Sequence, residues 1–504
     1  MAAFRVVPPR NCVRGVPTRS WGVHGTASST HGRAHEVLPT ATDASVRTLE
    51  VDTARPAGQA ESRANGMSVS GAETSADLRN VVDRGQVRTV FQPIVDLWSG
   101  TVVGYEALTR GPAGPYEQPA VLFAAARAQG CLGELDALCR RVAVQSAIRL
   151  KLFAPLTIFI NVEPDELTPS TLDPLIDLAA SAGGKLQLVL EVTERALASR
   201  PADLLASVRR LRTAGWRIAL DDVGADDLSL AFMSLLRPEV IKLDLQLVHR
   251  RPDRKIAEIM TAVNSFAERT GSVVVAEGIE TDAHLATATA LGAQLGQGWL
   301  FGRPASDPKT ARTGELRLPV PVDTAEQEIS PFECLPSSTM LRRSPRHLLI
   351  EVSQHLEQEA ARLGKTSMLL VTFQQAKYFT PDTAERYRGL AAQAGFVGAI
   401  TAGATSDPLR KQWAVTVLAP HFAAALLARE LPTDPGHVGQ RVFEFAVTYD
   451  RDVVEAAART LISRLRTPGT QLSTPSTVCT WTWPPKLDSS TDADISIGAG
   501  LQLD

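Results

Sequence analysis

Short apolar runs alternate with longer helix-like stretches over residues 77–305, and this alternation restricts the chain to few folds. An alternation of strands and helices predicts a parallel sheet covered by helices. Eight strands in a segment close to the ~250 residues typical of barrels favour an α/β fold of the (β/α)8, TIM-like type. An open doubly wound sheet would more often carry a Gly-rich phosphate loop after its first strand, and the sequence has none there. The predicted strands are Val90–Leu97, Thr101–Leu108, Leu156–Val162, Leu186–Val192, Arg217–Asp222, Val240–Leu243, Val273–Ala276 and Trp299–Phe301, and the clearest helices are Ala137–Leu150, Pro201–Ala214 and Lys255–Thr270.

Residues 345–466 predict a second, smaller α/β domain. Its first helix carries Leu348, Val352, Leu356 and Ala360 at intervals of four, which gives one apolar stripe. Further strands and a closing helix follow, and a domain of ~120 residues is of ordinary size. The predicted strands are Ser367–Phe373, Val397–Thr401, Trp413–Leu418 and Phe443–Thr448, and the closing helix is Asp452–Leu465.

Three other regions flank these two domains. Residues 1–76 are rich in Ala, Ser, Thr, Gly, Arg and Pro without periodicity, so we expect a disordered leader. Its Arg-rich, acid-free start resembles a transit peptide, but Pro and Gly interrupt the helix that such a peptide needs; alternatively, Met67 is the true start. Residues 306–344 predict a linker rich in Pro, Thr, Glu and Ser, and residues 467–504 predict a flexible tail.

Composition excludes several classes of protein. The 504 residues include 52 Lys and Arg against 55 Asp and Glu, for a net charge of −3, which argues against DNA binding through a basic face. No apolar run approaches the ~20 residues that span a bilayer, and the start lacks the apolar core of a secretory signal. The five cysteines form no CxxC pair and have no nearby His, which argues against disulfides and zinc. We therefore expect a cytoplasmic protein without membrane insertion.

Carboxylates and amides stand at the ends of nearly all predicted barrel strands. Such ends converge on one face of a barrel, where crowded carboxylates repel one another unless a cation lies among them. Oxygen ligands suit Mg²⁺ or Mn²⁺, and two such ions ~4 Å apart can promote phosphodiester hydrolysis. The residues are Glu106, Asn161, Glu191, Asp221, Asp222, Asp244, Glu277 and Gln297, with Lys242 as a cation among them.

Each of these residues also has an ordinary structural interpretation. An Asp-Asp pair after a strand, such as Asp221-Asp222, is more often a helix cap or a turn. A buried lysine such as Lys242 is usually paired or extended toward solvent, and Glu277 fits an ordinary loop. The occurrence of such residues at almost every strand end, in barrel order, favours the functional interpretation.

Residues 78–305 resemble the EAL-domain family of cyclic di-GMP phosphodiesterases. The resemblance covers slightly under half of the chain, and its eight motifs occur in family order. They are Phe91–Asp96 (FQPIVD), Gly104–Arg110 (GYEALTR), Phe159–Val162 (FINV), Leu190–Glu194 (LEVTE), Asp221–Gly224 (DDVG), Ile241–Asp244 (IKLD), Val275–Glu280 (VAEGIE) and Gln297–Pro304 (QGWLFGRP).

The resemblance implies a role for each matching residue. Glu106, Asn161, Glu191 and Asp221 would bind the first of two Mg²⁺ or Mn²⁺ ions, and Asp222 would serve the second. Glu277 matches the residue proposed as general base or as a ligand of the attacking water, and Lys242 would orient that water. Glu194, Glu280 and Asp244 resemble supporting carboxylates. The substrate-contacting positions are Gln92, Leu108, Arg110, Gln297 and Pro304. Water would open one phosphodiester of cyclic di-GMP and yield linear pGpG in bacterial signalling, and the family favours a homodimer.

Two segments depart from the family pattern. After the Asp pair, Val223 replaces a Phe, Asp226 replaces a Gly and Asp227 replaces an aromatic residue. This loop helps to place the second metal and lies at the family's dimer contact, so we expect either a slower enzyme or a different dimer. Residues 111–115 also replace a Trp-containing stretch.

The second domain is similar to the DICT domain, a sensory module found beside signalling domains. The similarity lies in short stretches, and each aromatic residue among them also fits a plain core role. The stretches are His347–Glu359, Thr372–Gln374, Tyr387–Ala391, Lys411–Trp413, Pro420–Ala424, Phe443–Phe445 and Thr448–Arg451.

Three hypotheses follow from the sequence. The first is a metal-dependent cyclic di-GMP phosphodiesterase tuned by an unknown signal or partner at the DICT-like domain. The second is a receptor or interaction module whose barrel binds cyclic di-GMP without cleaving it, which the altered 223–227 loop keeps open. The third is a scaffold, which the full acidic set disfavours because unneeded like charges cost stability.

Overall fold

The structure is a computed structural model that describes most of the two predicted domains. The described residues are 78–163, 166–193, 200–225, 227–308, 312–321, 330–432, 441–465 and 478–482. The predicted leader, Glu194, Asp226 and most of the predicted tail lie outside these ranges. All of these described residues belong to one compact unit.

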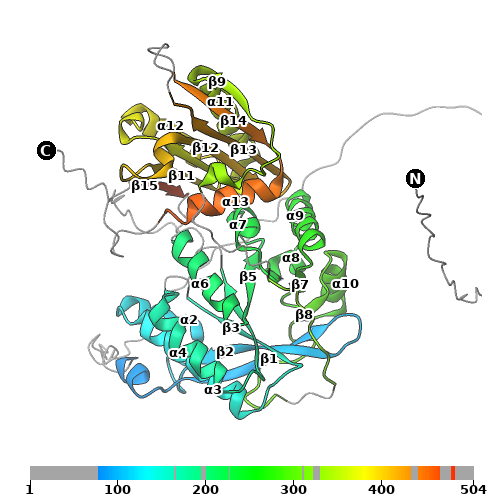
Figure 1. The fold of residues 1–504 in the computed structure, drawn as a ribbon. Helices are drawn as coiled ribbons and strands as arrows, with labels where there is room; N and C mark the ends of the chain where they lie inside the picture. The colour runs from blue at the N-terminus through cyan, green and yellow to red at the C-terminus, as the bar shows by residue number, and fades with distance from the viewer. Residues whose placement is uncertain are drawn as a thin grey trace, which may run out of the picture. The chain divides into compact units, whose positions relative to one another are not determined.

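The first domain is a closed eight-stranded barrel surrounded by helices (Figure 1). Strands β2 to β8 pair in parallel, but β1 runs antiparallel to both of its neighbours, β2 and β8. A short turn through Gly100 (φ 68°) joins β1 to β2 and leaves no length for a crossover helix, so the pair forms a hairpin. The strands are β1 Arg88–Asp96, β2 Val102–Arg110, β3 Thr157–Asn161, β4 Gln187–Val192, β5 Arg217–Val223, β6 Val240–Leu243, β7 Val273–Ala276 and β8 Leu295–Gln297.

The barrel helices begin and end where the sequence supplies caps. In α9, for example, Asp253 accepts a hydrogen bond from the backbone N–H of Ile256, and Gly271 ends the helix in the left-handed conformation (φ 76°). The helices are α2 Pro119–Ala128, α3 Leu132–Arg149, α4 Pro169–Ala180, α6 Pro201–Thr213, α7 Leu228–Leu236, α8 Leu245–His249, α9 Arg254–Thr270 and α10 Asp282–Ala290.

The predicted eighth strand, Trp299–Phe301, is wrong. The strand is Leu295–Gln297, and Trp299 instead lies 54% exposed in the turn that follows. The sequence pattern did not predict the true strand, because glycine is unfavourable in strands and the strand contains Gly296. The absence of a side chain at Gly296 leaves room for Leu97, Ile279 and Phe301. Gln297 therefore ends the last strand rather than preceding it.

The second domain is a seven-stranded mixed sheet in the order β15-β11-β10-β12-β13-β14-β9. It confirms the α/β class and has three strands that were not predicted: β9, which begins before residue 345, β13 within the predicted domain, and β15 within the predicted tail. The strands are β9 Arg342–Pro345, β10 Met368–Phe373, β11 Phe396–Thr401, β12 Gln412–Ala419, β13 Phe422–Glu430, β14 Val442–Thr448 and β15 Val478–Thr482. The helices are α11 Arg346–Leu363, α12 Pro381–Ala391 and α13 Arg451–Ile462, with short 3-10 turns at Pro331–Cys334, Gly364–Thr366, Ala376–Tyr378 and Pro408–Lys411.

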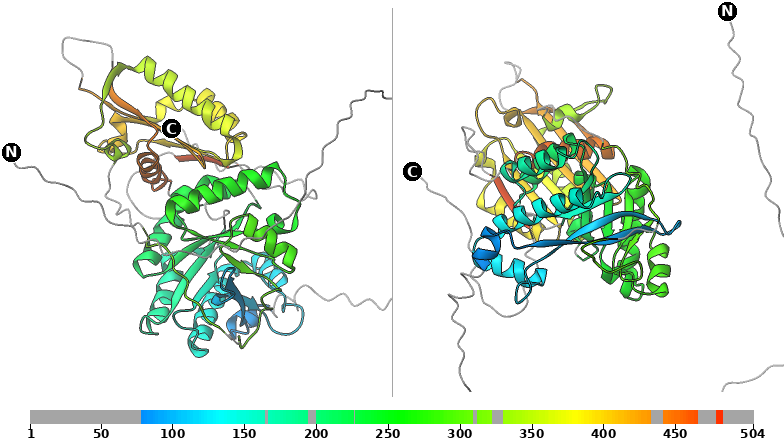
Figure 2. Two further views of the ribbon diagram at one scale, coloured as in Figure 1. Left: turned by 90° about the vertical axis from the view of Figure 1, so that its right-hand side faces the viewer. Right: turned by 90° about the horizontal axis from the view of Figure 1, so that it is seen from below.

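Both faces of this sheet are covered, as the two views of Figure 2 show. Leu369 and Val371 of β10 pack in one core with α11 and α12. The alternate residues Met368 and Leu370 face the other side and share a core with α13 and the barrel. A sheet buried on both faces needs apolar residues at successive positions, which accounts for the Ala- and Leu-rich composition of β13.

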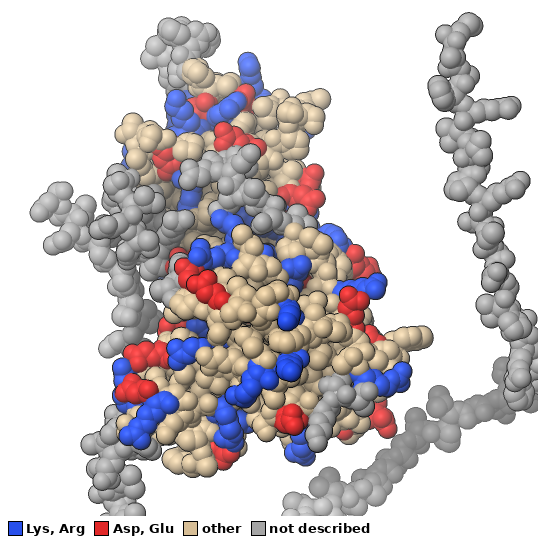
Figure 3. Space-filling model, turned by 60° about the horizontal axis from the view of Figure 1, so that its bottom comes forward, with Lys and Arg blue, Asp and Glu red and all other residues tan. Residues whose placement is uncertain are grey.

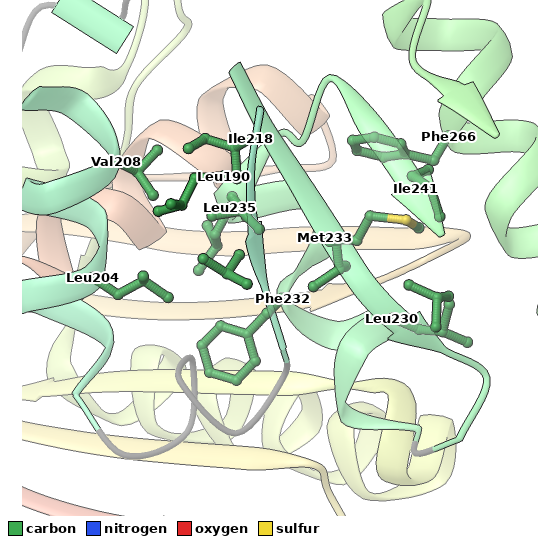
Figure 4. Packing of buried hydrophobic residues seen from close by; sticks show 14 of the residues in the cluster. Leu190, Leu204, Val208, Ile218, Leu230, Phe232, Met233, Leu235, Ile241 and Phe266 are labelled. Atoms are coloured by element: carbon green, nitrogen blue, oxygen red, sulfur yellow. The ribbon is translucent and has the colours of Figure 1, made fainter. Parts of the chain in front are cut away.

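The two domains meet at α7, the helix that follows β5. All residues from Ser229 to Leu236 are buried, as expected for a helix that is apolar all round. Leu235 lies beside Leu190 and Ile218 of the barrel (Figure 4). Phe232 makes an edge-to-face contact with Phe396 of β11, with ring centroids 5.1 Å apart. One continuous core therefore joins the barrel to the second sheet.

A buried ionic cluster completes this contact. Glu455 of α13 is 2% exposed, and its carboxylate lies 2.8 Å from Arg237 Nη2 and 3.3 Å from Arg459 Nη2. Arg451 and Arg269 lie farther away, at 3.8 and 3.9 Å. The Arg459 guanidinium also donates to the carbonyl oxygens of Ser234 and Leu235, in the last turn of α7 (2.8 and 3.2 Å). Glu455 thus compensates several arginines at once.

Charged residues of both signs are intermixed over the face of the barrel seen in Figure 3. Among the described residues, none of the helices combines the length and the apolar character that crossing a membrane requires.

Glu455→Ala should destabilise the protein by about 3 kcal/mol, because it removes a buried carboxylate and leaves several partly buried arginines without their shared counter-charge. The measurement is urea unfolding followed by circular dichroism. Asp452→Ala is the matched control, since Asp452 pairs with the same Arg237 (3.1 Å) but its side chain is 87% exposed, and its loss should cost under about 1 kcal/mol. Equal losses in the two variants would contradict a buried ionic cluster.

Candidate active site

The barrel register brings the predicted polar residues to one face. Asn161 at the end of β3 is paired with Glu191 of β4, and Gln92 of β1 lies opposite Glu106 of β2. Strands β5, β6 and β7 end nearby with Asp221, Lys242 and, just after β7, Glu277. The predicted convergence of strand ends is therefore observed for these residues.

Lys242 stands at the centre of this face. Its ammonium lies 2.7 Å from Glu191, 3.0 Å from Asp221, 2.6 Å from Glu277 and 3.9 Å from Glu106, and the side chain is 1% exposed. Burial alone would lower the pKa of Lys242, but the surrounding carboxylates raise it well above its usual value. Lys242 is therefore a fixed positive charge at neutral pH.

Glu106 is held by amides. One carboxylate oxygen accepts a hydrogen bond from Asn161 Nδ2 (2.7 Å) and the other from Gln297 Nε2 (2.5 Å). Gln297 Nε2 also donates to Gln92 Oε1 (3.1 Å). Burial would raise the pKa of Glu106, but Lys242 and these amides outweigh it and hold the pKa below its usual value. Glu106 is therefore an anion with a fixed orientation.

Two other carboxyl groups are shifted the opposite way. Burial, followed by repulsion from Glu106, raises the pKa of Glu191 well above its usual value despite the contact with Lys242. Burial also raises the pKa of Glu277 to about 8, with Lys242 opposing the shift and Asp221 adding to it. A cation bound among these groups would favour their ionised forms.

The residues present fit a divalent cation. Within the described part of the chain, both oxygens of Glu191 and Oδ1 of Asp221 are buried and accept no hydrogen bond, although both side chains are in ionic contact with Lys242. Oxygen atoms of Asp221, Asp222 and Glu277 lie within 4.8 Å of one another. Clustered carboxylate oxygens are the ligands that Mg²⁺ and Mn²⁺ prefer.

The altered loop after Asp221 retains the turn that places Asp222. Asp222 (φ 55°) and Gly224 (φ 105°) are both left-handed, and a Cβ at Gly224 would approach Leu247 Cδ1 to 2.5 Å. Val223, in place of the family's Phe, is fully buried, and Asp227 forms an ion pair with Lys255 of α9. The charge of Asp227 is thus compensated.

The remaining predicted residues are placed less directly. Asp244 caps α8 by accepting from the N–H of Gln246 (2.7 Å), and Glu280 is exposed. Leu108, Arg110 and Pro304 are partly exposed, and Arg110 donates to the carbonyl oxygen of Thr109 (2.8 Å).

A cavity of about 500 Å³ adjoins the acidic face. It is lined by Asn161, Asp222 and Asp244 together with Asp136 and Arg140 of α3. This volume lies within the range of small-molecule sites. The cavity therefore extends from the acidic residues toward α3.

Sequence reasoning missed Asp136 and Arg140, because an acid and a base four residues apart usually form an exposed pair. Here both are buried, and Arg140 Nη2 lies 2.7 Å from Asp136 Oδ2. Arg140 Nε and Nη1 have no hydrogen-bond partner within the described residues. Burial raises the pKa of Asp136 to about 6, although Arg140 and the N–H of Glu163 oppose the shift.

Comparison with known protein families identifies both domains of the chain. Residues 75–304 match the family model of the EAL domain, and residues 332–431 match that of the sensory domain in diguanylate cyclases and two-component systems, DICT. The chain contains an EAL domain. It also contains a DICT domain, so both resemblances seen in the sequence are confirmed.

Three relatives illustrate these matches. A probable cyclic di-GMP phosphodiesterase of Escherichia coli, PdeG, is 31% identical over 236 residues, which is 45% of this chain and 46% of that protein. The cyclic di-GMP phosphodiesterase NbdA of Pseudomonas aeruginosa is 31% identical over 235 residues, 45% of this chain and 30% of that protein. The chain thus spans less than half the length of either. The solved complex of Klebsiella pneumoniae BlrP1 with calcium and cyclic di-GMP is 31% identical over 44% of this chain and 56% of that chain, with a TM-score of 0.38.

Lys242→Met should lower stability by about 3–5 kcal/mol in the absence of divalent ions, since it leaves several buried carboxylates without a counter-charge. Thermal unfolding in EDTA measures the loss, and added Mn²⁺ should reverse part of it. Lys255→Met, which removes a partly exposed ion pair, should cost no more than about 1 kcal/mol. A Lys242 variant as stable as the parent would contradict the charge arrangement described above.

Asp136 should make stability depend on pH. Its folded pKa of about 6 lies above the value of 3.8 for a free carboxyl, so folding favours the protonated form. Its favourable contribution is complete below pH 4 and is lost as pH rises to 6, a change of up to about 3 kcal/mol. Urea unfolding of the parent and of Asp136→Asn at pH 4 and pH 7 measures it. Relative to the parent, the free energy of unfolding of the Asn variant should be higher at pH 7 than at pH 4. If the difference in free energy between the two proteins is the same at both pH values, the shifted pKa is refuted.

Proposed function

We propose that this protein hydrolyses cyclic di-GMP to linear pGpG with Mg²⁺ or Mn²⁺, lowering the level of this second messenger in the bacterial cytoplasm. The main support is the Lys242-centred set of carboxylates at the mouth of an EAL barrel. Relatives that bear the name cyclic di-GMP phosphodiesterase share about 31% identity with nearly half of the chain.

The metal-binding groups are assigned from the acidic face. Glu106, Asn161, Glu191 and Asp221 would hold one ion, and Asp222 would help to hold a second. When bound, such ions lower the pKa of water and offset negative charge on a phosphate. The amides of Asn161 and Gln297 already fix the Glu106 carboxylate (2.7 and 2.5 Å), so this part of the site needs little reorganisation.

Glu277 and Lys242 carry the proton and charge chemistry. The Glu277 carboxylate would accept the proton of the attacking water, and the 2.6 Å contact with Lys242 fixes its position. The Lys242 ammonium would stabilise negative charge that develops on the phosphate oxygens. We assign to Asp244, Glu280 and Glu194 supporting roles, in which they position the loops that carry these groups.

The substrate would lie over the acidic face of the barrel, and the adjoining cavity would extend its site toward α3. Gln92, Leu108, Arg110, Gln297 and Pro304 are proposed to contact it, as in the family. Arg140 adds buried donors at Nε and Nη1 on the α3 side. Guanidinium donors match both phosphate oxygens and the O6/N7 edge of guanine.

A homodimer and tuning by the DICT domain remain predictions from the sequence. The contact between α13 and α7 offers a physical route for tuning, since α7 begins shortly after Asp222. The receptor hypothesis rests on the altered loop, but the ion pair of Asp227 with Lys255 reduces the added negative charge.

Glu277→Gln should reduce kcat by about 10²–10⁴-fold, because an amide cannot accept the proton of the attacking water. The assay is formation of pGpG from cyclic di-GMP by the full chain with Mn²⁺, resolved by chromatography. Glu258→Gln, which alters an exposed ion pair on α9, should retain parental activity. Binding of cyclic di-GMP without any pGpG from the parent would favour the receptor, and the absence of both would refute a cyclic di-GMP function.

A further inference from the structure

A second cavity, of about 360 Å³, lies within the DICT domain. Residues of α11 and α12 cover one side of it, and β10 and β12 form the other. Its volume suits a small ligand of one or two rings. It is separate from the acidic face of the barrel, since the two cavities share no lining residue.

Four aromatic side chains form part of the walls of this cavity. Phe373, Tyr387 and Trp413 line it from the sheet and α12, and Tyr378 lines it from the adjacent 3-10 turn. Phe373 and Tyr387 meet edge to face with ring centroids 5.8 Å apart. Aromatic side chains held in fixed positions favour flat ligands, which gain contact area without ordering the protein further.

The charged residues are unevenly compensated. Glu357 is 4% exposed, accepts a hydrogen bond from Tyr387 Oη and lies 3.3 Å from Arg386. Asp382 lies in the first turn of α12, where the helix dipole stabilises a negative charge. Arg346 is exposed and contacts the Tyr378 ring (5.4 Å), and within the described residues no carboxylate lies within ion-pair distance of it. One cation at the mouth thus has no acidic partner there.

We propose that this cavity binds a small planar aromatic anion. The rings of Phe373, Tyr387 and Trp413 would contact the aromatic part. The Arg346 guanidinium would bind the carboxylate or phosphate at the mouth, and Arg386 would contribute through donors that Glu357 does not use. Burial of a flat ring supplies affinity, and charge-assisted hydrogen bonds to Arg346 select the anion.

The cavity is connected to the barrel through strand β10. The cavity is on the face of β10 that packs with α11 and α12, whereas the opposite face shares a core with α13 and α7. The strand that lines the cavity is therefore one layer away from the helix that follows Asp222. The binding proposal itself does not depend on cyclic di-GMP hydrolysis.

The test is calorimetric titration of the full chain with 1-naphthoate and with 1-naphthylmethanol, a neutral compound of similar shape. The anion should bind at least about tenfold more tightly, as expected for a charge-assisted contact. Arg346→Ala should remove this preference and leave binding of the neutral compound unchanged. Arg343→Ala, an exposed arginine on β9 that does not line the cavity, should behave as the parent.

A second variant tests the cavity itself. Val371→Phe should fill the space beside Trp413 and abolish binding of both compounds, and circular dichroism would verify that the variant is folded. Adenosine 5′-monophosphate in the same titration distinguishes a nucleotide phosphate from an aromatic carboxylate, because tighter binding of either one identifies the source. Equal affinity of the parent for the charged and neutral naphthalenes, or no binding of either, would overturn the proposal.

Discussion

The ionic contacts of the Lys242 ammonium are the interactions on which the acidic face depends. Four carboxylates that converge from separate strands would repel one another strongly, and a single cation that contacts three of them within 3.0 Å makes the arrangement possible without further ions. Apart from their contacts with Lys242, the buried carboxylate oxygens of Glu191 and Asp221 Oδ1 have no hydrogen-bond partner among the described residues. One arrangement therefore has two consequences. The lysine offsets the charge of the carboxylates, which stabilises the fold, and the carboxylate oxygens can still bind divalent ions.

The same principle operates at the contact between the domains, with the signs reversed. Glu455 is one buried carboxylate among several arginines, and Arg459 uses its remaining donors on the carbonyl groups that end α7. Both clusters contact the segment from β5 to α7, in which Asp221 lies near the end of β5 and Arg237 follows the last residue of α7. Two carboxylates of the acidic face, Asp221 and Asp222, and the residues that contact the DICT domain thus lie at opposite ends of one short segment.

Sequence patterns predicted the barrel and its polar face because parallel strands have a fixed direction: once Glu106, Asn161 and Glu191 stand at strand ends, closure brings them together. Local composition gave wrong predictions for segments whose structure depends on tertiary packing. The apolar run Trp299–Phe301 looks like a strand but follows one, and the Ala-rich β13 has no alternation because both of its faces are buried. The burial of Asp136 and Arg140 depends on how α3 lies against the barrel, and their spacing alone suggests an exposed pair. Likewise, the four contacts of Lys242 depend on side-chain conformations that its motif does not specify.

The departures in the 223–227 loop have different physical consequences. Val223 shortens a core side chain, yet it is fully buried, and Gly224 keeps the left-handed turn that Leu247 requires. Asp227 is neutralised by Lys255. The loop therefore retains the turn that places Asp222, and the charge of Asp227 is compensated. Because α7 packs against α13 and β11, a homodimer built on this helix would first have to displace the chain's own DICT domain. Any dimer that leaves this core intact must form through another surface.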